Sequence, residues 1–419
     1  MKKCVLVFFI YFLVIAIGNG YSQDAPIITL DSLIDEALNK NPEIQATYYG
    51  WQQGAYKIKQ ASSLSDPVAS YTRFGENVET RLGPQEAKYG LSQKILFPGK
   101  LNLKAKAQSK QADILQEKYE ATKRNVIKNI KFVYYDIFWV DKAIQITEQE
   151  KAILESLEKV VQKKYQSNLA PQQDVVKVQV ELSKLIDKLF LLKQNRKSLV
   201  AKMNSLVNRT KGTKLGSVSN IKPEDFKYNL EQLHAKARDS SQQLEAASLD
   251  IERAKYEKSL ARLDYLPDFT FGVDYIEIGG GHTTSPNDGQ DAWMGRVSVN
   301  IPIWFDKLGS QVKEKEAKLK ETKKNYENIE NSISYEIEDL YFKIVTYQDI
   351  ILLYDTALIP QTELSFYAAK IAYETGKVDF LNWLDAERVL LQTNLAYYKA
   401  IADYLKSIAY LEMVVGTKL

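Results

Sequence analysis

One stretch of the chain limits its possible folds more than any other. Residues 309 to 374 carry apolar side chains at helical spacing, which predicts an amphipathic helix of about 66 residues. At 1.5 Å per residue, such a helix is roughly 100 Å long. No globular domain of ordinary size can hold it. A turn at 373–376 precedes a second helix of about 40 residues that runs back to Val415. The sequence therefore predicts an elongated molecule.

The same order of elements occurs earlier in the chain. A strand ending at 97–100 precedes a helix of similar length, a turn follows at 165–168, and a returning helix reaches Val207. The matching positions are Leu33, Ala37 and Pro67 with Leu233, Ala237 and Pro267, at an offset of 200, and Tyr165, Val176 and Val207 with Tyr373, Leu384 and Val415, at an offset of 208. We infer an internal duplication in which each repeat reads helix, strand, loop, strand, long helix, turn, helix.

This duplication sets the predicted boundaries. They are a first repeat at 23–208 with a β-hairpin at 68–95, a linker at 209–229, and a second repeat at 230–419 with a β-hairpin at 268–303. We expect the shorter helices of each repeat to stack end to end beside a long helix.

Two local features of the helices are also predicted. The first helix runs from Leu30 to Ser63, with Asp31 or Ser32 as its cap. Pro360 lies inside the second long helix and lacks a backbone donor, so it predicts a bend within one turn.

The N-terminus has the pattern of a secretory signal peptide at residues 1–22. Lys2 and Lys3 precede an apolar run from Val5 to Ile17, and small residues follow, which places the expected cleavage after Ser22. The run is about 13 residues long, whereas a membrane span needs about 20. The only cysteine, Cys4, would leave with the signal, so we expect neither disulfides nor thiol chemistry in the mature chain.

The overall composition excludes some partners. The formal net charge is +3 over 419 residues, and it falls to about +1 without Lys2 and Lys3, so there is no electrostatic argument for nucleic acid. Tyrosine is abundant, with 26 residues. Several tyrosines lie on or beside the predicted strands, where a membrane-interface belt would need them.

Four predicted strands, about 68–74, 87–95, 269–275 and 293–301, each have an apolar and a polar face. The polar face carries Lys88, Ser92, Lys94, Thr270, Asp274, Arg296, Ser298 and Asn300. A soluble core on one face is the ordinary meaning of such alternation, but an exported chain also suits lipid outside and a wet lumen inside. Because four strands cannot close in lipid, copies of the chain must complete the barrel. Two copies give eight strands and a filled interior, whereas three give twelve and an open pore.

No residues point to catalysis, a cofactor or a metal. His234 and His282 are the only histidines and lack metal-ligand spacing. The glycines at 279–281 are not followed by Lys-Ser or Lys-Thr, so they do not form a phosphate-binding loop. We expect them in a mobile outer loop.

The duplicated plan resembles the TolC family of outer membrane efflux channels over essentially the whole mature chain. The segments that carry the resemblance are LIDEALNKNP at 33–42, LSQKILFPGKL at 91–101, YETGKVDFLNWLDAE at 373–387 and the closing 410–416. The resemblance implies a mainly α fold with a small β part, in which three copies form a twelve-stranded outer membrane β-barrel and a periplasmic α-barrel. It also implies an exit duct that serves a periplasmic adaptor and an inner membrane pump of the RND or ABC type. The segments at 97–100 and 359–361 look like the heavy-metal and cation branch.

Two other functions remain open from the sequence. They are the channel of a type I protein secretion system and a structural periplasmic coiled-coil protein that does not conduct.

The same resemblance places a gate at the helical tips. The family's acidic and tyrosine positions correspond here to Asp174, Tyr373, Asn382 and Asp385. Asn382 stands where the best-known member has aspartate, and Val378 where it has arginine. We expect Asp174 to accept a hydrogen bond from Tyr373, and Asp385 to face the pore axis and attract cations. A solvated charge on the helix face is the other explanation of Asp385.

Overall fold

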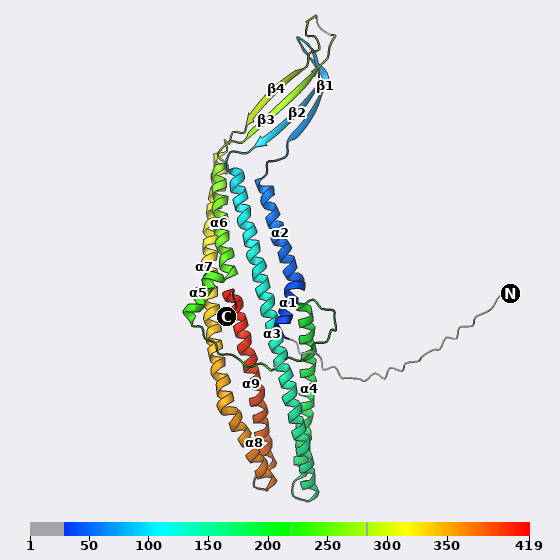
Figure 1. Cartoon of the computed structure of the whole chain (residues 1–419), viewed down its shortest axis with the longest axis vertical. Coiled ribbons are helices and arrows are strands. Elements are labelled where there is room, and N and C mark those ends of the chain that lie inside the picture. Colours follow the sequence, from blue (N-terminus) through cyan, green and yellow to red (C-terminus); the bar gives the residue numbers. More distant parts are fainter. Residues whose placement is uncertain (1–28, 219, 282–283) are drawn as a thin grey trace, which may run out of the picture.

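The computed structural model describes residues 29–218, 220–281 and 284–419, so the predicted signal peptide at 1–22 lies outside the described residues. The molecule is long and narrow, with the strands at one end and the turns that connect pairs of helices at the other (Figure 1). Among the described residues, no helix is both long and apolar enough to cross a membrane.

The elements follow the duplicated order. In the first repeat they are α1 (Leu30–Lys40), α2 (Pro42–Ser62), β1 (Val68–Thr80), β2 (Gly83–Ile95), α3 (Lys100–Gln166) and α4 (Gln172–Leu206). In the second they are α5 (Leu230–Ser240), α6 (Gln242–Leu263), β3 (Phe269–Ile278), β4 (Ala292–Val299), α7 (Phe305–Leu353), the π-helical turn η1 (Tyr354–Leu358), α8 (Ile359–Glu374) and α9 (Phe380–Val415).

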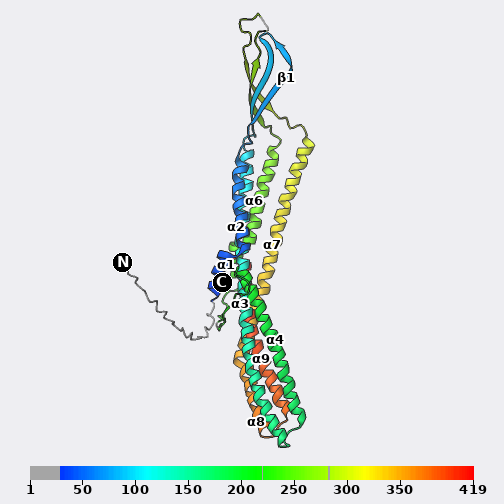
Figure 2. The ribbon, with the colours of Figure 1, turned by 90° about the vertical axis from the view of Figure 1, so that its right-hand side faces the viewer.

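The shorter helices stack end to end beside the long ones, as predicted. Helices α2 and α4 lie one after the other along α3, while α6 and then α9 lie along the continuous column of α7, η1 and α8 (Figure 1 and Figure 2). Apolar side chains from these neighbours form three separate clusters along the column, two near the middle and one at the tip. The long column is therefore stabilised at several points by tertiary packing rather than by helix propensity alone.

The prediction of a single first helix from Leu30 to Ser63 is wrong, because this segment forms two helices, α1 and α2. Asn41 has an extended backbone, and its side chain accepts hydrogen bonds from the amides of Glu43 and Ile44, so it caps α2 while Pro42 takes the first helical position. The cap of α1 is Thr29, which accepts from the amide of Ser32, and neither Asp31 nor Ser32 has that role. The second repeat breaks at the equivalent place between α5 and α6.

The four strands form one antiparallel sheet in the order β1-β2-β3-β4. Strand β1 extends farther than predicted, to Thr80, and β2 starts earlier than predicted, at Gly83. Both are longer because backbone pairing continues through residues that lack apolar alternation. Strand β4 ends two residues earlier than predicted, at Val299. Both β1 and β4 leave one edge without a partner within the described chain.

Just before Pro360, where a bend is predicted, the regular hydrogen-bond ladder is interrupted. The α-helical ladder gives way to η1, and the amide of Ile359 donates to the carbonyl of Tyr354 instead of to the residue four positions back. This wider turn leaves room for a proline ring that would otherwise meet the carbonyl of Thr356. The helix itself starts at Phe305, four residues before the predicted start at Gly309.

Candidate functional site

The polar residues predicted to line a lumen do share one face of the sheet. Ser92 is paired with Gly272, which is paired with Arg296, and Lys94 is joined in the same way through Thr270 to Ser298. Residues directly opposite one another in a sheet lie on the same face. The sheet therefore presents a row of hydroxyl and basic groups to one side.

One ion pair dominates the middle of this face. The ammonium group of Lys88 lies 3.1 Å from the carboxylate of Asp274, and only 1 % of Asp274 is exposed. Gly90 makes this possible, because a Cβ built there would come within 2.6 Å of the Asp274 carboxylate. The absence of a side chain at Gly90 thus lets the carboxylate lie across the neighbouring strand.

The base of the sheet contains a second polar group of contacts. Asp268 lies 2.9 Å from the ammonium of Lys100 and 3.3 Å from that of Lys94, and it accepts a hydrogen bond from the amide of Phe97. Asn300, predicted in the lumen, lies past the end of β4, and its side chain accepts from the amide of Asp268. Its role is therefore to fix the junction between strands and helices.

The opposite face of the sheet is apolar and carries aromatic rings in register. Tyr71, Tyr89, Tyr275 and Trp293 stand directly opposite one another across the four strands, and all are exposed. The rings of Tyr71 and Tyr89 have centroids 5.2 Å apart. Each of these side chains has an apolar ring and a polar OH or NH group, and a row of such side chains is typical of a membrane–water interface.

An apolar band separates this row from a second aromatic group. The exposed residues of the band are Leu91, Ile95, Phe271, Val273, Val297 and Val299. Trp304 and Phe305 follow at the helical end, where the ring of Phe305 stacks on Tyr265. The strand from Trp293 to Val299 spans roughly 20 Å. Outer membrane barrels carry an apolar band of about 25 Å between two aromatic belts, so this face has the dimensions of a lipid-facing wall.

The predicted gate residues gather at the far end of the molecule. Asp174 lies in the first turn of α4, Tyr373 in the last turn of α8, and Asn382 and Asp385 near the start of α9. Both turns lie side by side opposite the strands (Figure 1). Asp385 is exposed, whereas the amide of Asn382 donates to the cap residue Asp379.

The hydrogen bond predicted between Asp174 and Tyr373 does not form. Tyr373 is only 5 % exposed, and its hydroxyl has no hydrogen-bond partner within the described chain. Burial, with a smaller effect from the nearby Asp174 carboxylate, raises the pKa of Tyr373 to about 12. Partial burial also raises the pKa of Asp174, against the opposing charge of Lys177. The two side chains are therefore close without being bonded.

Lys164 makes the contact that sequence reasoning missed. From the end of α3, its ammonium donates to the carbonyl oxygen of Tyr373 at 2.6 Å and lies 4.1 Å from the centre of the Tyr373 ring. The ring also packs on Trp383 and Phe380. A lysine in the last turn of a helix is common, so nothing in the sequence marked this one. It joins the tips of the two repeats.

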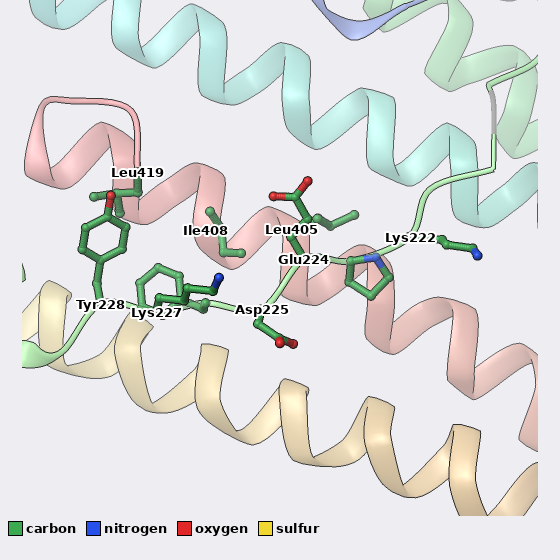
Figure 3. A pocket seen from close by; sticks show the side chains of 10 residues that line it. Lys222, Glu224, Asp225, Lys227, Tyr228, Leu405, Ile408 and Leu419 are labelled. Atoms are coloured by element: carbon green, nitrogen blue, oxygen red, sulfur yellow. The ribbon is translucent and has the colours of Figure 1, made fainter.

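A groove of about 800 Å³ lies where residues 222–228 cross α9. The hydroxyl of Tyr404 donates to the carbonyl of Glu224 at 2.6 Å and so holds this segment against the helix. Figure 3 shows the side chains of Lys222, Glu224 and Asp225 pointing in different directions. They do not converge on a reacting centre, and the segment has the character of a structural crossing between repeats.

No metal centre is present among the described residues, which contain no cluster of three or more His, Cys, Asp or Glu side chains that could hold an ion. His234 lies 3.9 Å from Glu338, and His282 falls outside the described residues.

Comparisons with known proteins agree with this geometry. The family model described as outer membrane efflux protein matches residues 33–209 and 233–417. Among solved structures, the outer membrane protein VceC of Vibrio cholerae is 17% identical with a TM-score of 0.77, covering 93% of this chain and 96% of that one. CusC is 15% identical with a TM-score of 0.79, covering 94% and 93%. The outer membrane channel MtrE of Neisseria gonorrhoeae, in its open state, is 13% identical with a TM-score of 0.75, covering 94% of each. A search of curated proteins finds no significant match.

Proposed function

This chain belongs to the outer membrane efflux protein family, and on that premise we propose that it is the exit duct of a tripartite efflux system. Its place is the bacterial outer membrane, with the helical column in the periplasm. In the proposed role it conducts cargo passively after an inner membrane pump and a periplasmic adaptor have delivered it. The observation that carries the proposal is the two-faced sheet, with two unpaired edges, at the end of a long helical column.

The unpaired edges support closure by copies of the chain. An exposed strand edge in lipid leaves backbone donors and acceptors unsatisfied, and each costs several kcal/mol. If β4 of one copy pairs with β1 of the next, three copies supply twelve strands and no free edge. The interior of such a barrel is wide enough for a pore, whereas eight strands would be filled by side chains. We therefore propose a homotrimer.

The two faces of the sheet then have distinct roles. The aromatic and apolar face contacts lipid, and the face with Lys88, Ser92, Lys94, Thr270, Asp274, Arg296 and Ser298 lines the lumen. Lys88 is paired with Asp274 and Lys94 with Asp268, whereas Arg296 makes no ion pair with the described residues of its own chain, so Arg296 adds a positive charge to this face. We expect the β-barrel to favour anions slightly over cations.

The tips supply the proposed gate. Twelve helical columns enclose an open tube unless their ends lean inward, and the turns beside Asp174, Tyr373, Asn382 and Asp385 are the ends farthest from the membrane. Exposed Asp385 is free to face the axis, where three copies would repel one another and bind cations. The chain carries no metal-binding cluster among its described residues, so we propose that the pump selects the cargo.

Conductance across a planar bilayer tests this function. The purified full-length protein should give discrete conductance steps, and Arg296→Glu should shift the reversal potential towards cation selectivity, while Arg296→Lys leaves it unchanged. Asp385→Ala should weaken block by multivalent cations added on the periplasmic side, whereas Asp385→Glu should retain it. Protein that inserts into the bilayer yet never conducts would favour the structural coiled-coil function instead.

A further inference from the structure

Two carboxyl groups face each other between α3 and α9, in the half of the helical column that ends at the tip. Glu150 of α3 is 5 % exposed and Glu387 of α9 is 3 % exposed. Their carboxyl groups lie within hydrogen-bonding reach of each other, and one oxygen of each has no hydrogen-bond partner within the described chain. Two carboxyl groups can share a hydrogen bond only if one of them carries a proton. A single shared proton at this place would join the first repeat to the second.

The surroundings of the pair are apolar. Glu150 lies four residues before Leu154 on the buried face of α3, and Glu387 lies four residues before Leu391 on the buried face of α9. Helix α8 contributes the ring of Phe366, which contacts Trp383 one turn before Glu387. Ionising both carboxyls in such a place would be costly, because burial penalises each charge and the two negative charges would repel each other.

The charged groups facing the pair are few. Lys188 of α4 acts on both carboxyls, and Arg388 of α9 acts on Glu387. Glu181 of α4 adds negative charge near Glu387, and it accepts hydrogen bonds from Arg388 and from Lys184. Because Arg388 is already bonded to Glu181, the Lys188 ammonium is the cation left to balance the pair among the described residues, which is enough for one negative charge and not two.

The directions of the pKa shifts agree with this count of charges. Burial, followed by the hydrogen bond and charge of Glu150, raises the pKa of Glu387 to about 10. Burial also raises the pKa of Glu150, and it lowers the pKa of Lys188. Near neutral pH the packed pair holds one proton that the same groups would release in water.

We propose that Glu150 and Glu387 form a proton-operated latch between the two repeats, closed while they share a proton and released when the proton is lost. The inference rests on the proposed gate, since opening the tip would separate α3 from α9 and admit water to the pair. Hydrated carboxyls return to ordinary pKa values, so opening releases a proton. By linkage, a rise in pH then favours the open state. The effect is limited to pH values between the ordinary glutamate pKa and about 10. Within this range, the ratio of open to closed tips changes by at most tenfold per pH unit for each chain.

Distances between spin labels at the tips test the latch without requiring conduction. The sequence has no cysteine after Cys4, so Gln172→Cys and Leu381→Cys place labels on the exposed first turns of α4 and α9. In the full-length protein in lipid, raising the pH from about 5.5 to about 8.5 should shift the distance distribution towards longer, open distances. Glu387→Gln keeps a neutral hydrogen-bonding group, and its tips should stay closed across this range.

Glu363→Gln is the matched control, because Glu363 is an exposed carboxyl on the neighbouring α8; it should follow the wild type. Glu150→Gln should reproduce Glu387→Gln, and it serves if the first variant fails to fold. A wild-type distance that is independent of pH, or an equal shift in either latch variant, overturns the proposal. Failure of the duct function appears separately, as protein that never conducts in the bilayer while its tip distances still respond to pH.

Discussion

The ammonium group of Lys164 joins the tips of the two repeats. It satisfies a carbonyl at the C-terminal end of α8 and lies over the face of the Tyr373 ring. Both interactions favour a cation, the first because helix C-termini carry partial negative charge and the second because of the ring quadrupole. The tip therefore receives a basic contact from α3.

We predict that Lys164→Met loosens the end of α8. A charged hydrogen bond and a cation–π contact together contribute about 1 to 3 kcal/mol here. The amides of Thr375 and Lys377, which donate to Ile371 and Ala372, should then exchange with solvent about 5- to 100-fold faster by mass spectrometry or NMR.

Lys163→Met is the control for that change. Lys163 lies in the same last turn of α3, so it has the same relation to the helix dipole, but its side chain is exposed. Equal exchange rates in the two variants would show that Lys164 acts only through its charge at the helix end.

At the scale of whole elements, the second long column owes its irregularity to Pro360. The residues before it form η1, and the column resumes as α8 towards the tip. The first long helix, α3, is continuous from Lys100 to Gln166, so the two repeats differ in the regularity of the long column that reaches the tip.

Pro360→Ala should restore a backbone donor and stabilise the column by about 1 to 3 kcal/mol. The amides of residues 357–359 and 361 should exchange more slowly with solvent as the α-helical ladder extends through η1. Pro42→Ala is the comparison, because Pro42 occupies the first position of α2, where its amide would have no helical partner, and little change is expected. Faster or unchanged exchange at 357–361 would mean that packing, rather than proline, sets the π-helical turn.

These elements also show what the sequence could predict. The long helices and the four strands follow from periodicities that are local to each segment, and Pro360 acts on its own helix. The break at Asn41 had a local signal, a capping residue followed by Pro42, which the sequence-based prediction of one helix overlooked, and a distant contact adds to it because the Asn41 side-chain amide donates to the carbonyl of Leu206 at 2.7 Å. The Glu150–Glu387 pair likewise joins two repeats. A carboxyl on the apolar face of each helix was a visible signal, but only the packing identifies the partner.

For the molecule as a whole, the central claim is that three copies of this chain enclose one pore. The polar face of the sheet was predictable because alternation marks it residue by residue, whereas the contact of Asn300 with Asp268 and the pairing of Lys88 with Asp274 needed the folded structure. The register places Arg296 on the polar face, in one row with Gly272 and Ser92. Each copy therefore contributes one such arginine to a shared lumen.

Channels assembled from a mixture of wild-type and Arg296→Glu chains, measured one at a time in a planar bilayer, test this claim directly. If three copies share one pore, equal amounts of the two chains should give four classes of ion selectivity, with zero, one, two or three replaced arginines, in proportions of about 1:3:3:1. Only two classes, identical to those of the unmixed proteins, would show that each conducting unit contains a single kind of chain and would contradict the shared pore.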